Sequence, residues 1–178
     1  MRPYHVDEVL ITPRQLERRV DEVAREIAAG GRSENLVVIG ILRGSFIFLA
    51  DLVRWFSLND LHPRIDFMIM ESYGSGTTAA KEPAVTRDCT IDLAGADVVV
   101  VDDILDTGRT LQKAVAHLKA KGAKSVRACA LLDKPSRRVV PFEADFSGFK
   151  IEDAFVVGYG LDYDGFGRNL PDIYTVME

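Results

Sequence analysis

Apolar residues follow two patterns along the chain, a helical repeat and short uninterrupted runs. The helical repeat begins after Thr12-Pro13, a pair typical of a helix N-cap followed by proline at the first helical position. It ends at Gly30-Gly31, where glycine stops a helix. The apolar residues at helical spacing between these points are Leu16, Val20, Val23, Ala24 and Ile27. This pattern predicts an amphipathic helix.

The segment from Ser45 to Phe56 is apolar almost all round, and only Asp51 and Arg54 interrupt it. A helix of this kind is buried, or half-buried against another subunit. We therefore expect a helix here, and an assembly of identical chains, a homodimer or a homotetramer.

The short apolar runs predict β-strands, and a further helix is expected from about Gly108 to Lys121. The predicted strands are Leu36–Ile41, Ile65–Met70, Val98–Val101, Val126–Leu132 and Phe155–Tyr159. Strands that alternate with helices imply βαβ units and a mostly parallel sheet with right-handed crossovers. The fold class is therefore α/β. Because no interdomain linker is visible, we expect a single domain over residues 1–178.

One segment, Ser72 to Asp88, has no periodicity and is rich in glycine, serine and threonine. Long segments of this kind within compact domains are often lids over a site. The sequence therefore predicts a long mobile loop here.

Composition and charge narrow the possible functions. The formal net charge of -5 argues against a non-specific nucleic-acid binder. No signal-peptide core and no membrane-length apolar run occur, so we expect a cytoplasmic protein without membrane contact. Cys89 and Cys129 have no metal-ligand spacing, and Cys129 is expected to be a small buried apolar residue.

The stretch VVVVDDILDTGRTL, residues 98–111, carries the clearest chemical signal. Its apolar strand ends in Asp102, Asp103 and Asp106, and Thr107 to Thr110 open the next helix. Carboxylates beside backbone donors and hydroxyls suit a ligand that is both polyhydroxylated and phosphorylated, such as a sugar phosphate. The position also fits, because ligands of open α/β sheets bind beyond the carboxyl ends of the strands. Neither GxxxxGK[ST] nor GxGxxG occurs, which excludes those nucleotide-binding loops.

This stretch resembles the phosphoribosyl-pyrophosphate signature of the type I phosphoribosyltransferases. Further segments, in the same order along the chain, are similar to the hypoxanthine-guanine phosphoribosyltransferases of purine salvage. They are Leu42-Arg43-Gly44-Ser45, Ser72-Tyr73, Lys134 and FVVGYGLDY at 155–163. The resemblance implies a mostly parallel twisted sheet flanked by helices, with a small hood formed by terminal segments. It also implies transfer of 5-phosphoribosyl from phosphoribosyl pyrophosphate to N9 of hypoxanthine and guanine, with Mg²⁺ as cofactor.

The resemblance assigns roles within residues 98–111. Asp102 and Asp103 would engage the ribose hydroxyls directly or through Mg²⁺, because ionised carboxylates only accept hydrogen bonds. Asp106 would be the general base near N7 of the purine. The residues expected to bind the 5′-phosphate are Thr107, Gly108, Arg109 and Thr110.

The remaining roles are spread along the chain. Leu42, Arg43 and Gly44 would form a pyrophosphate loop, commonly with a cis Leu42–Arg43 peptide in the family, and Arg168 would reach the same group. Ser72 and Tyr73 would begin a catalytic lid that closes over the reacting sugar. The residues expected around the purine are Lys134, which would donate to O6, Phe155, which would stack on the base, Val156, which would offer backbone contacts, and Asp162, a magnesium-associated carboxylate.

The sequence departs from the family pattern in two places. Lys134 is followed by PSRR, and Asp102 stands where many relatives have glutamate, so individual contacts transfer less securely than the reaction. Two alternatives stay open. One is an RNA-binding regulator on the same scaffold, although such regulators typically have tyrosine in place of Asp106. The other is a transferase that prefers xanthine or adenine.

Overall fold

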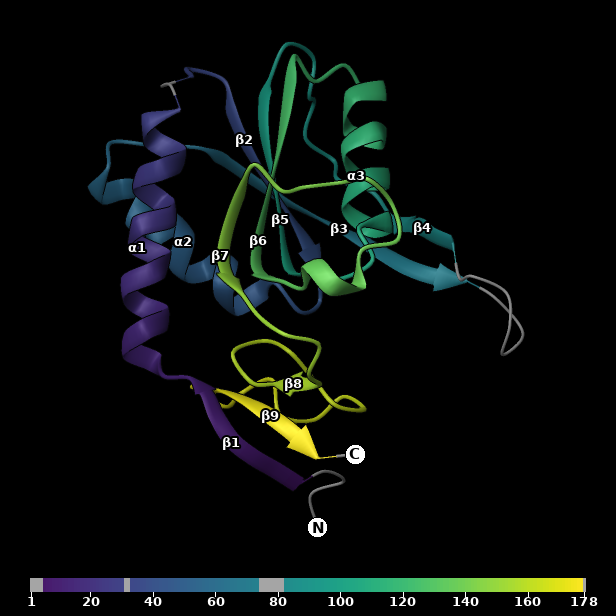
Figure 1. The fold of residues 1–178 in the computed structure, drawn as a ribbon. Helices are drawn as coiled ribbons and strands as arrows, with labels where there is room; N and C mark the ends of the chain where they lie inside the picture. The colour runs from purple at the N-terminus through teal and green to yellow at the C-terminus, as the bar shows by residue number, and fades with distance from the viewer. Residues whose placement is uncertain (1–4, 31–32, 74–81, 178) are drawn as a thin grey trace.

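The computed structural model describes residues 5–30, 33–73 and 82–177, and its centre is a six-stranded sheet (Figure 1). The strand order is β4-β3-β2-β5-β6-β7. All neighbours pair in parallel except β3 and β4, which are antiparallel. The strands are β2 Leu36–Leu42, β3 Arg64–Tyr73, β4 Glu82–Arg87, β5 Asp97–Leu105, β6 Ser125–Asp133 and β7 Phe146–Lys150. The predicted α/β class with a mostly parallel sheet is confirmed.

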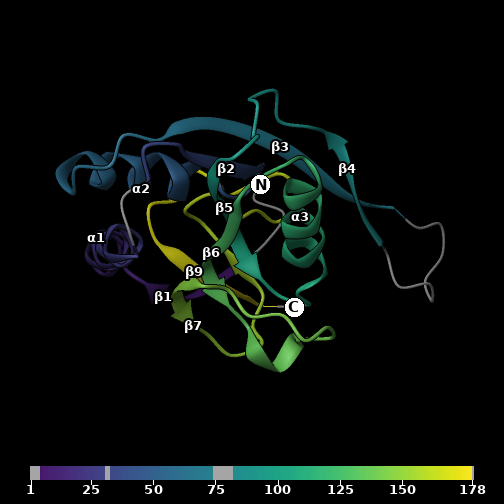
Figure 2. The same ribbon diagram turned by 90° about the horizontal axis from the view of Figure 1, so that it is seen from above.

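Helices cover both faces of this sheet (Figure 2). The helices α1 (Pro13–Ala29) and α2 (Phe46–Leu58) lie on one face, and α3 (Arg109–Ala120) lies on the other. Alternate residues of a strand point to opposite faces. Val38 and Val99 accordingly belong to the core beneath α1 and α2, whereas Val37 and Val98 belong to the core beneath α3.

The first helix forms as its sequence pattern predicts. The Thr12 backbone N–H donates to Gln15 Oε1 at 2.9 Å, and the Gln15 N–H donates to Thr12 Oγ1 at 3.4 Å. This reciprocal capping box satisfies backbone donors that the first turn leaves free. The buried residues of α1 are the five apolar residues of the helical repeat, Leu16, Val20, Val23, Ala24 and Ile27.

A second, smaller sheet of three antiparallel strands joins the two ends of the described chain. Its order is β1-β9-β8, formed by His5–Ile11, Ile173–Met177 and Val156–Val157. We call this sheet the hood. Figure 1 shows it beyond the end of the central sheet toward which the parallel strands run. The hood was expected from the family resemblance, but the apolar pattern had not predicted β1 or β9.

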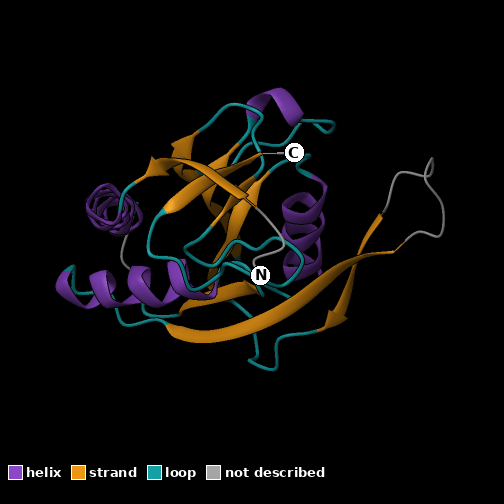
Figure 3. Cartoon of the chain, turned by 90° about the horizontal axis from the view of Figure 1, so that it is seen from below, coloured by secondary structure: helices purple, strands orange, loops and turns teal. Residues whose placement is uncertain are grey.

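The prediction of one structureless loop from Ser72 to Asp88 is wrong at both ends. β3 continues to Tyr73, and β4 pairs with it, Met70 opposite Val85 and Tyr73 opposite Glu82. Figure 3 shows this hairpin extending away from the body of the molecule. Its cross-strand hydrogen bonds form without a continuous apolar run, so the sequence pattern gives little sign of them. The middle of the predicted loop, residues 74–81, lies outside the described residues, so its role as a lid stays a prediction.

Three other differences are smaller. The half-buried edge strand β7 and the short 3₁₀ helix Pro135–Arg137 were not predicted, because neither has a long apolar run. The strand predicted over Phe155–Tyr159 shortens to Val156–Val157, because Gly158 and Tyr159 have positive φ angles that end it.

Cys129 is fully buried, as predicted. None of the described helices is long and apolar enough to cross a membrane.

Candidate active site

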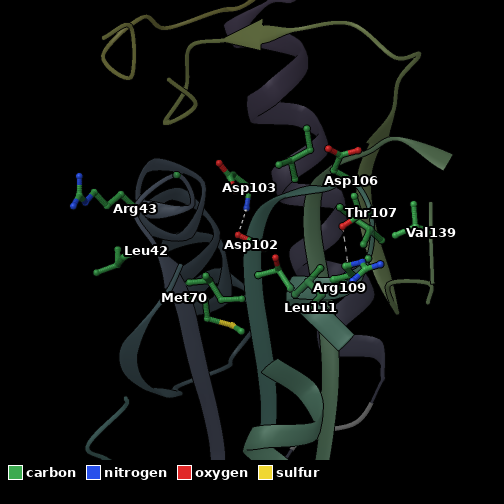
Figure 4. A pocket seen from close by; sticks show the side chains of 16 residues that line it. Leu42, Arg43, Met70, Asp102, Asp103, Asp106, Thr107, Arg109, Leu111 and Val139 are labelled. Carbon is green, nitrogen blue, oxygen red and sulfur yellow. Dashed lines mark hydrogen bonds between the residues drawn. The ribbon is translucent and has the colours of Figure 1, made fainter. Parts of the chain in front are cut away.

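A cavity of about 550 Å³ opens at the carboxyl ends of β2 and β5, beside the start of α3 (Figure 4). Its wall combines the turn after β2, the end of β5 and the first turn of α3. Ten of the predicted site residues line it: Leu42, Arg43, Gly44, Asp102, Asp103, Asp106, Thr107, Gly108, Arg109 and Thr110. The structure thus brings together two sequence segments that lie about sixty positions apart (42–44 and 102–110).

Asp102 and Asp103, which we call the acid pair, lie near the end of β5, directly after its run of four buried valines. Asp102 is 6% exposed, and its Oδ1 accepts a hydrogen bond of 3.0 Å from the Asp103 N–H. Burial, and then the neighbouring charge of Asp103, raise the pKa of Asp102 well above its usual value. Burial likewise raises the pKa of Asp103. Negative charge is therefore costly here unless a cation or hydroxyl donors offset it.

Gly44 packs its backbone directly against the acid pair. A Cβ atom built on Gly44 would lie 1.7 Å from Asp103 Oδ2, so no other residue fits at this position without displacing the carboxylate. The preceding Leu42–Arg43 peptide is cis, as the family resemblance implied. Figure 4 shows the Arg43 side chain pointing away from Asp103. The turn therefore presents mainly its backbone to the cavity.

The start of α3 forms the wall opposite this turn. Gly108 precedes the helix with a φ of 87°, and a Cβ there would also lie 2.9 Å from Val140. The Thr107 Oγ1 accepts a 3.4 Å hydrogen bond from the Arg109 N–H. The guanidinium of Arg109 forms an ion pair with Glu82 of β4. A helix start with free backbone N–H groups is suited to bind an anion.

Asp106 lies at the edge of the cavity, where two arginines meet it. Arg137 Nε contacts Asp106 Oδ1 at 3.1 Å. The neighbouring Arg138 donates to the backbone oxygens of Leu105 and Asp106, and its guanidinium also pairs with Asp133. Arg138 therefore braces the backbone of the Asp106 turn, whereas Arg137 contacts its carboxylate.

The residues predicted to surround a purine lie outside the lining of this cavity. Lys134 is buried and follows β6, and its Nζ donates to the Ala154 carbonyl at 2.6 Å. Phe155 is 48% exposed and packs edge-on against Tyr163, with ring centroids 5.3 Å apart. Val156 is buried in β8 of the hood. We call this group of residues the purine half, and its assigned roles stay predictions.

Asp162 and Arg168 pair with each other. Asp162 Oδ1 lies 2.7 Å from Arg168 Nη2, and Arg168 Nη1 donates to the Gly160 carbonyl at 2.7 Å. The charge of Arg168 also opposes, in small part, the rise that burial causes in the pKa of Asp103. Within the described ranges, no three His, Cys, Asp or Glu residues gather in a group that could hold a metal ion.

Ser72 and Tyr73 occupy the last two positions of β3, opposite Pro83 and Glu82 of β4. Their predicted role in a lid depends on the following segment, which is not among the described residues, so it stays a prediction.

Sequence reasoning missed four charged residues that contact the site. Glu82 pairs with Arg109, Arg137 with Asp106, and Arg138 braces the turn, while Asp153 lies between Arg137 and Lys134. For Arg137 and Arg138, the one available signal was the PSRR sequence after Lys134, because it contains both arginines and departs from the family pattern. Pairs of this kind form between segments far apart in sequence, so spacing along the chain does not reveal them.

The parallel sheet, the glycine turn against an acid pair and the hood together define a phosphoribosyltransferase. The phosphoribosyl transferase domain family matches residues 5–164, and the chain belongs to this family. It is 44% identical over 171 residues to the hypoxanthine-guanine phosphoribosyltransferase of Aquifex aeolicus, covering 96% of this chain and 94% of the relative. It is 41% identical to the hypoxanthine phosphoribosyltransferase of Escherichia coli K12, covering 97% of each chain.

A solved structure agrees with these relatives. The hypoxanthine-guanine phosphoribosyltransferase of Bacillus anthracis superposes with a TM-score of 0.90 at 39% identity, covering 97% of this chain and all of that one. The similarity therefore extends over the central sheet, the cavity and the hood together.

Proposed function

We propose that the protein transfers the 5-phosphoribosyl group of phosphoribosyl pyrophosphate to N9 of hypoxanthine or guanine, in purine salvage. The products are the nucleoside monophosphate, IMP or GMP, and pyrophosphate. The observation that carries this proposal is the single cavity that the acid pair, Asp106, the start of α3 and the Gly44 turn line together. The names of relatives that match nearly the whole chain support the same substrates.

In the proposed reaction, a bond forms between N9 of the purine and C1′ of the ribose. The bond from C1′ to the pyrophosphate oxygen breaks, and its electron pair leaves with the pyrophosphate. The purine loses a proton, and Asp106 is placed to accept it from N7. Its carboxylate lies at the cavity edge and is partly exposed, which gives a bound base access to it. General base assistance of this kind typically contributes about a hundredfold to ten-thousandfold in rate.

The sugar phosphate half of the substrate fits the wall of the cavity. The acid pair would accept hydrogen bonds from the ribose 2′- and 3′-hydroxyls. The N–H groups and hydroxyls of residues 107–110 would bind the 5′-phosphate. Backbone N–H groups of the Leu42–Gly44 turn would hold the pyrophosphate, and Arg168 would reach it from the tail. Ser72 and Tyr73 would help to exclude water from the reacting carbon.

The acid pair also fits the expected Mg²⁺ ion. Mg²⁺ prefers carboxylate and phosphate oxygens, and burial has raised the pKa of both carboxyls, so a cation would relieve unfavourable charge. Asp102 and Asp103 would hold the ion beside the ribose, and the resemblance associates Asp162 with Mg²⁺ near the pyrophosphate. When bound, the ion would offset the negative charge of the pyrophosphate. For Asp162 this requires that its ion pair with Arg168 opens or is shared.

Selection of a 6-oxopurine would depend on Lys134. Its ammonium group has three donors, one of which now reaches the Ala154 carbonyl, so it can also donate to O6 of a base. Adenine presents an amino group at this position and would leave the buried donor without its acceptor, which costs roughly 1–3 kcal/mol. Phe155 would stack on the base, and Val156 would offer backbone contacts.

The proposal extends to an assembly of identical chains. Helix α2 buries Phe48 and Phe56 in the core but exposes Phe46 to 43% and Leu58 to 74%. Apolar side chains exposed on a helix of this kind are suited to a contact between subunits. Sedimentation velocity should therefore show a homodimer or a homotetramer, and a monomer at micromolar concentration would contradict this part of the proposal.

The deciding experiment is turnover of purified protein with phosphoribosyl pyrophosphate, Mg²⁺ and each of four purines. We expect kcat/KM for hypoxanthine and guanine to exceed the value for adenine by at least about tenfold, in line with the lost hydrogen bond. Xanthine tests the alternative specificity in the same assay. Saturable RNA binding without turnover of any purine would overturn the proposal in favour of a regulator.

A further inference from the structure

The backbone of the segment after β6 is fastened to the turn that carries Asp106. The Lys134 N–H donates to the Leu105 carbonyl at 3.0 Å, and the Val139 N–H donates to the Thr107 carbonyl at 3.1 Å. The segment between these two bonds therefore has a fixed position along the cavity edge. Arg137 lies within it, at the end of the short 3₁₀ helix.

The side chain of Arg137 connects Asp106, at the cavity edge, with Asp153 and through it with Lys134 of the purine half. Its Nε contacts Asp106 Oδ1 at 3.1 Å, and its Nη1 contacts Asp153 Oδ2 at 3.5 Å. The other oxygen of Asp153 lies 3.8 Å from Lys134 Nζ. The four residues form a row of alternating charge, Asp106, Arg137, Asp153 and Lys134. We call this row the charge relay, meaning a chain of contacts and not a path for protons.

The geometry leaves Asp106 able to act as a base. Arg137 contacts Oδ1, and no hydrogen bond from a described residue reaches Oδ2. A guanidinium is planar and rigid, so contacts through two of its nitrogens fix the direction of both carboxylates. Arg137 thus constrains the orientation of Asp106 without covering the oxygen that would take the proton.

We propose that Arg137 is a positioning residue of the purine half, which aligns Asp106 with Lys134 through the charge relay. This inference rests on the proposed function, in which Asp106 faces N7 of the purine and Lys134 faces O6. N7 and O6 lie on the same edge of the base. A fixed arrangement of the two side chains would therefore hold both contacts at once. In this arrangement Arg137 would contact neither the purine nor the sugar.

The charge relay can align Asp106 with Lys134, but it adds little to the stability of the fold. The side chains of Arg137, Asp106 and Asp153 are 49%, 36% and 52% exposed. Ion pairs at such exposure contribute little to folding. The hydrogen bond to Asp106, and then its charge and that of Asp153, raise the pKa of Arg137, so the arginine is charged throughout any assay range. Loss of the relay should therefore appear in catalysis before it appears in the melting temperature.

The test compares Arg137→Ala, Arg137→Lys and Asp153→Asn with the wild-type enzyme, using hypoxanthine and phosphoribosyl pyrophosphate. Misplacement of a catalytic group by about 1 Å can cost about a hundredfold in rate, and we expect Arg137→Ala to lower kcat by about tenfold to a hundredfold. The KM for phosphoribosyl pyrophosphate should stay within about twofold, because that substrate binds in the other half of the site. Arg137→Lys keeps a cation near Asp106 and should give an intermediate kcat.

A double variant separates a shared pathway from two independent effects. If Arg137 and Asp153 act through one relay, Arg137→Ala combined with Asp153→Asn should lose no more activity than Arg137→Ala alone. The matched control is Arg18→Ala, which removes an exposed arginine paired with Glu22 on α1, far from the cavity. This control should match the wild type in kcat and in both KM values.

Distinct outcomes would overturn the two proposals. A wild-type protein without turnover of hypoxanthine or guanine refutes the proposed function itself. An active wild type with unchanged kcat in Arg137→Ala refutes only the positioning role. A fall in kcat accompanied by an equal rise in the KM for phosphoribosyl pyrophosphate, or by a lower melting temperature than the Arg18→Ala control, assigns Arg137 a structural role instead.

Discussion

At the residue scale, the proposed function depends most on Asp106, the expected general base. Its carboxylate lies at the cavity edge, held on one oxygen by Arg137. Asp106→Asn keeps the size of the side chain but removes its ability to accept a proton. We expect kcat to fall by about a hundredfold to ten-thousandfold, whereas the KM for phosphoribosyl pyrophosphate changes little. Steady-state kinetics with hypoxanthine measures both, and an unchanged kcat would exclude Asp106 as the base.

Gly44 supports a second prediction at this scale. Because a Cβ would lie 1.7 Å from Asp103 Oδ2, Gly44→Ala must displace either the turn or the carboxylate. We expect the KM for phosphoribosyl pyrophosphate to rise by at least about tenfold, the effect of one lost charged hydrogen bond.

The control for Gly44→Ala is Gly95→Ala. Gly95 has a positive φ, of 68°, which Gly44 does not, and a Cβ there would meet no atom within 4 Å. Backbone strain should then lower the stability of Gly95→Ala by about 1 kcal/mol, with no change in KM. If both variants lose stability and neither changes the KM for phosphoribosyl pyrophosphate, the contact between Gly44 and Asp103 has no part in substrate binding.

At the scale of elements, the β3–β4 hairpin is fastened to α3 by Asp88. This residue follows β4, and its Oδ2 lies 2.8 Å from Lys121 Nζ and 3.0 Å from His117 Nε2. Partial burial on its own would raise the pKa of Asp88. The hydrogen bonds from Lys121 and His117 outweigh it and lower the pKa to about 2. The hairpin and helix α3 are therefore joined by a charged contact.

This contact predicts a pH dependence of stability. The folded-state pKa of Asp88 is lower than its value of about 4 in the unfolded chain, so the stabilisation is complete above about pH 4. It is lost as the pH falls from about 4 to 2. Because the side chain is partly exposed, we discount for solvent screening and expect about 1 kcal/mol. Urea unfolding of the wild type and Asp88→Asn should differ by this amount at pH 7 and converge near pH 2. A difference independent of pH would contradict it.

The elements also show which parts of the fold can be predicted from sequence. The helix α1 has both a capping box and an apolar repeat, so its bounds and its buried residues agree with the prediction. The strands β4, β7 and β9 lie at sheet edges or in the hood, where most side chains are not fully buried. The strands β4 and β7 pair with the strands just before them, β3 and β6, and β9 pairs with the remote β1, but local periodicity contains no information about any of these partners.

At the scale of the whole molecule, the two halves of the site differ in how far sequence predicts them. The sugar phosphate half comes mainly from residues 98–111, so one continuous motif indicates its chemistry. The purine half combines Lys134 with Phe155 and Val156 from a separate segment, and only the family resemblance pointed to them. The contacts of Arg137 and Glu82 were not predicted, because ion pairs between loops depend on the assembled fold.

The hood sets the order in which a newly made chain can complete its site. The Phe155 carbonyl accepts a hydrogen bond from the Val176 N–H, and Val156 pairs with Thr175, so β8 is held by β9. The strand β1, although it precedes the other described elements, pairs with β9 as well. On the ribosome, where folding proceeds from the N-terminus, the cavity wall at the start of α3 can form as soon as α3 and β6 have emerged. The purine half must wait until residue 177 is made, so β1 remains an unpaired strand for most of synthesis.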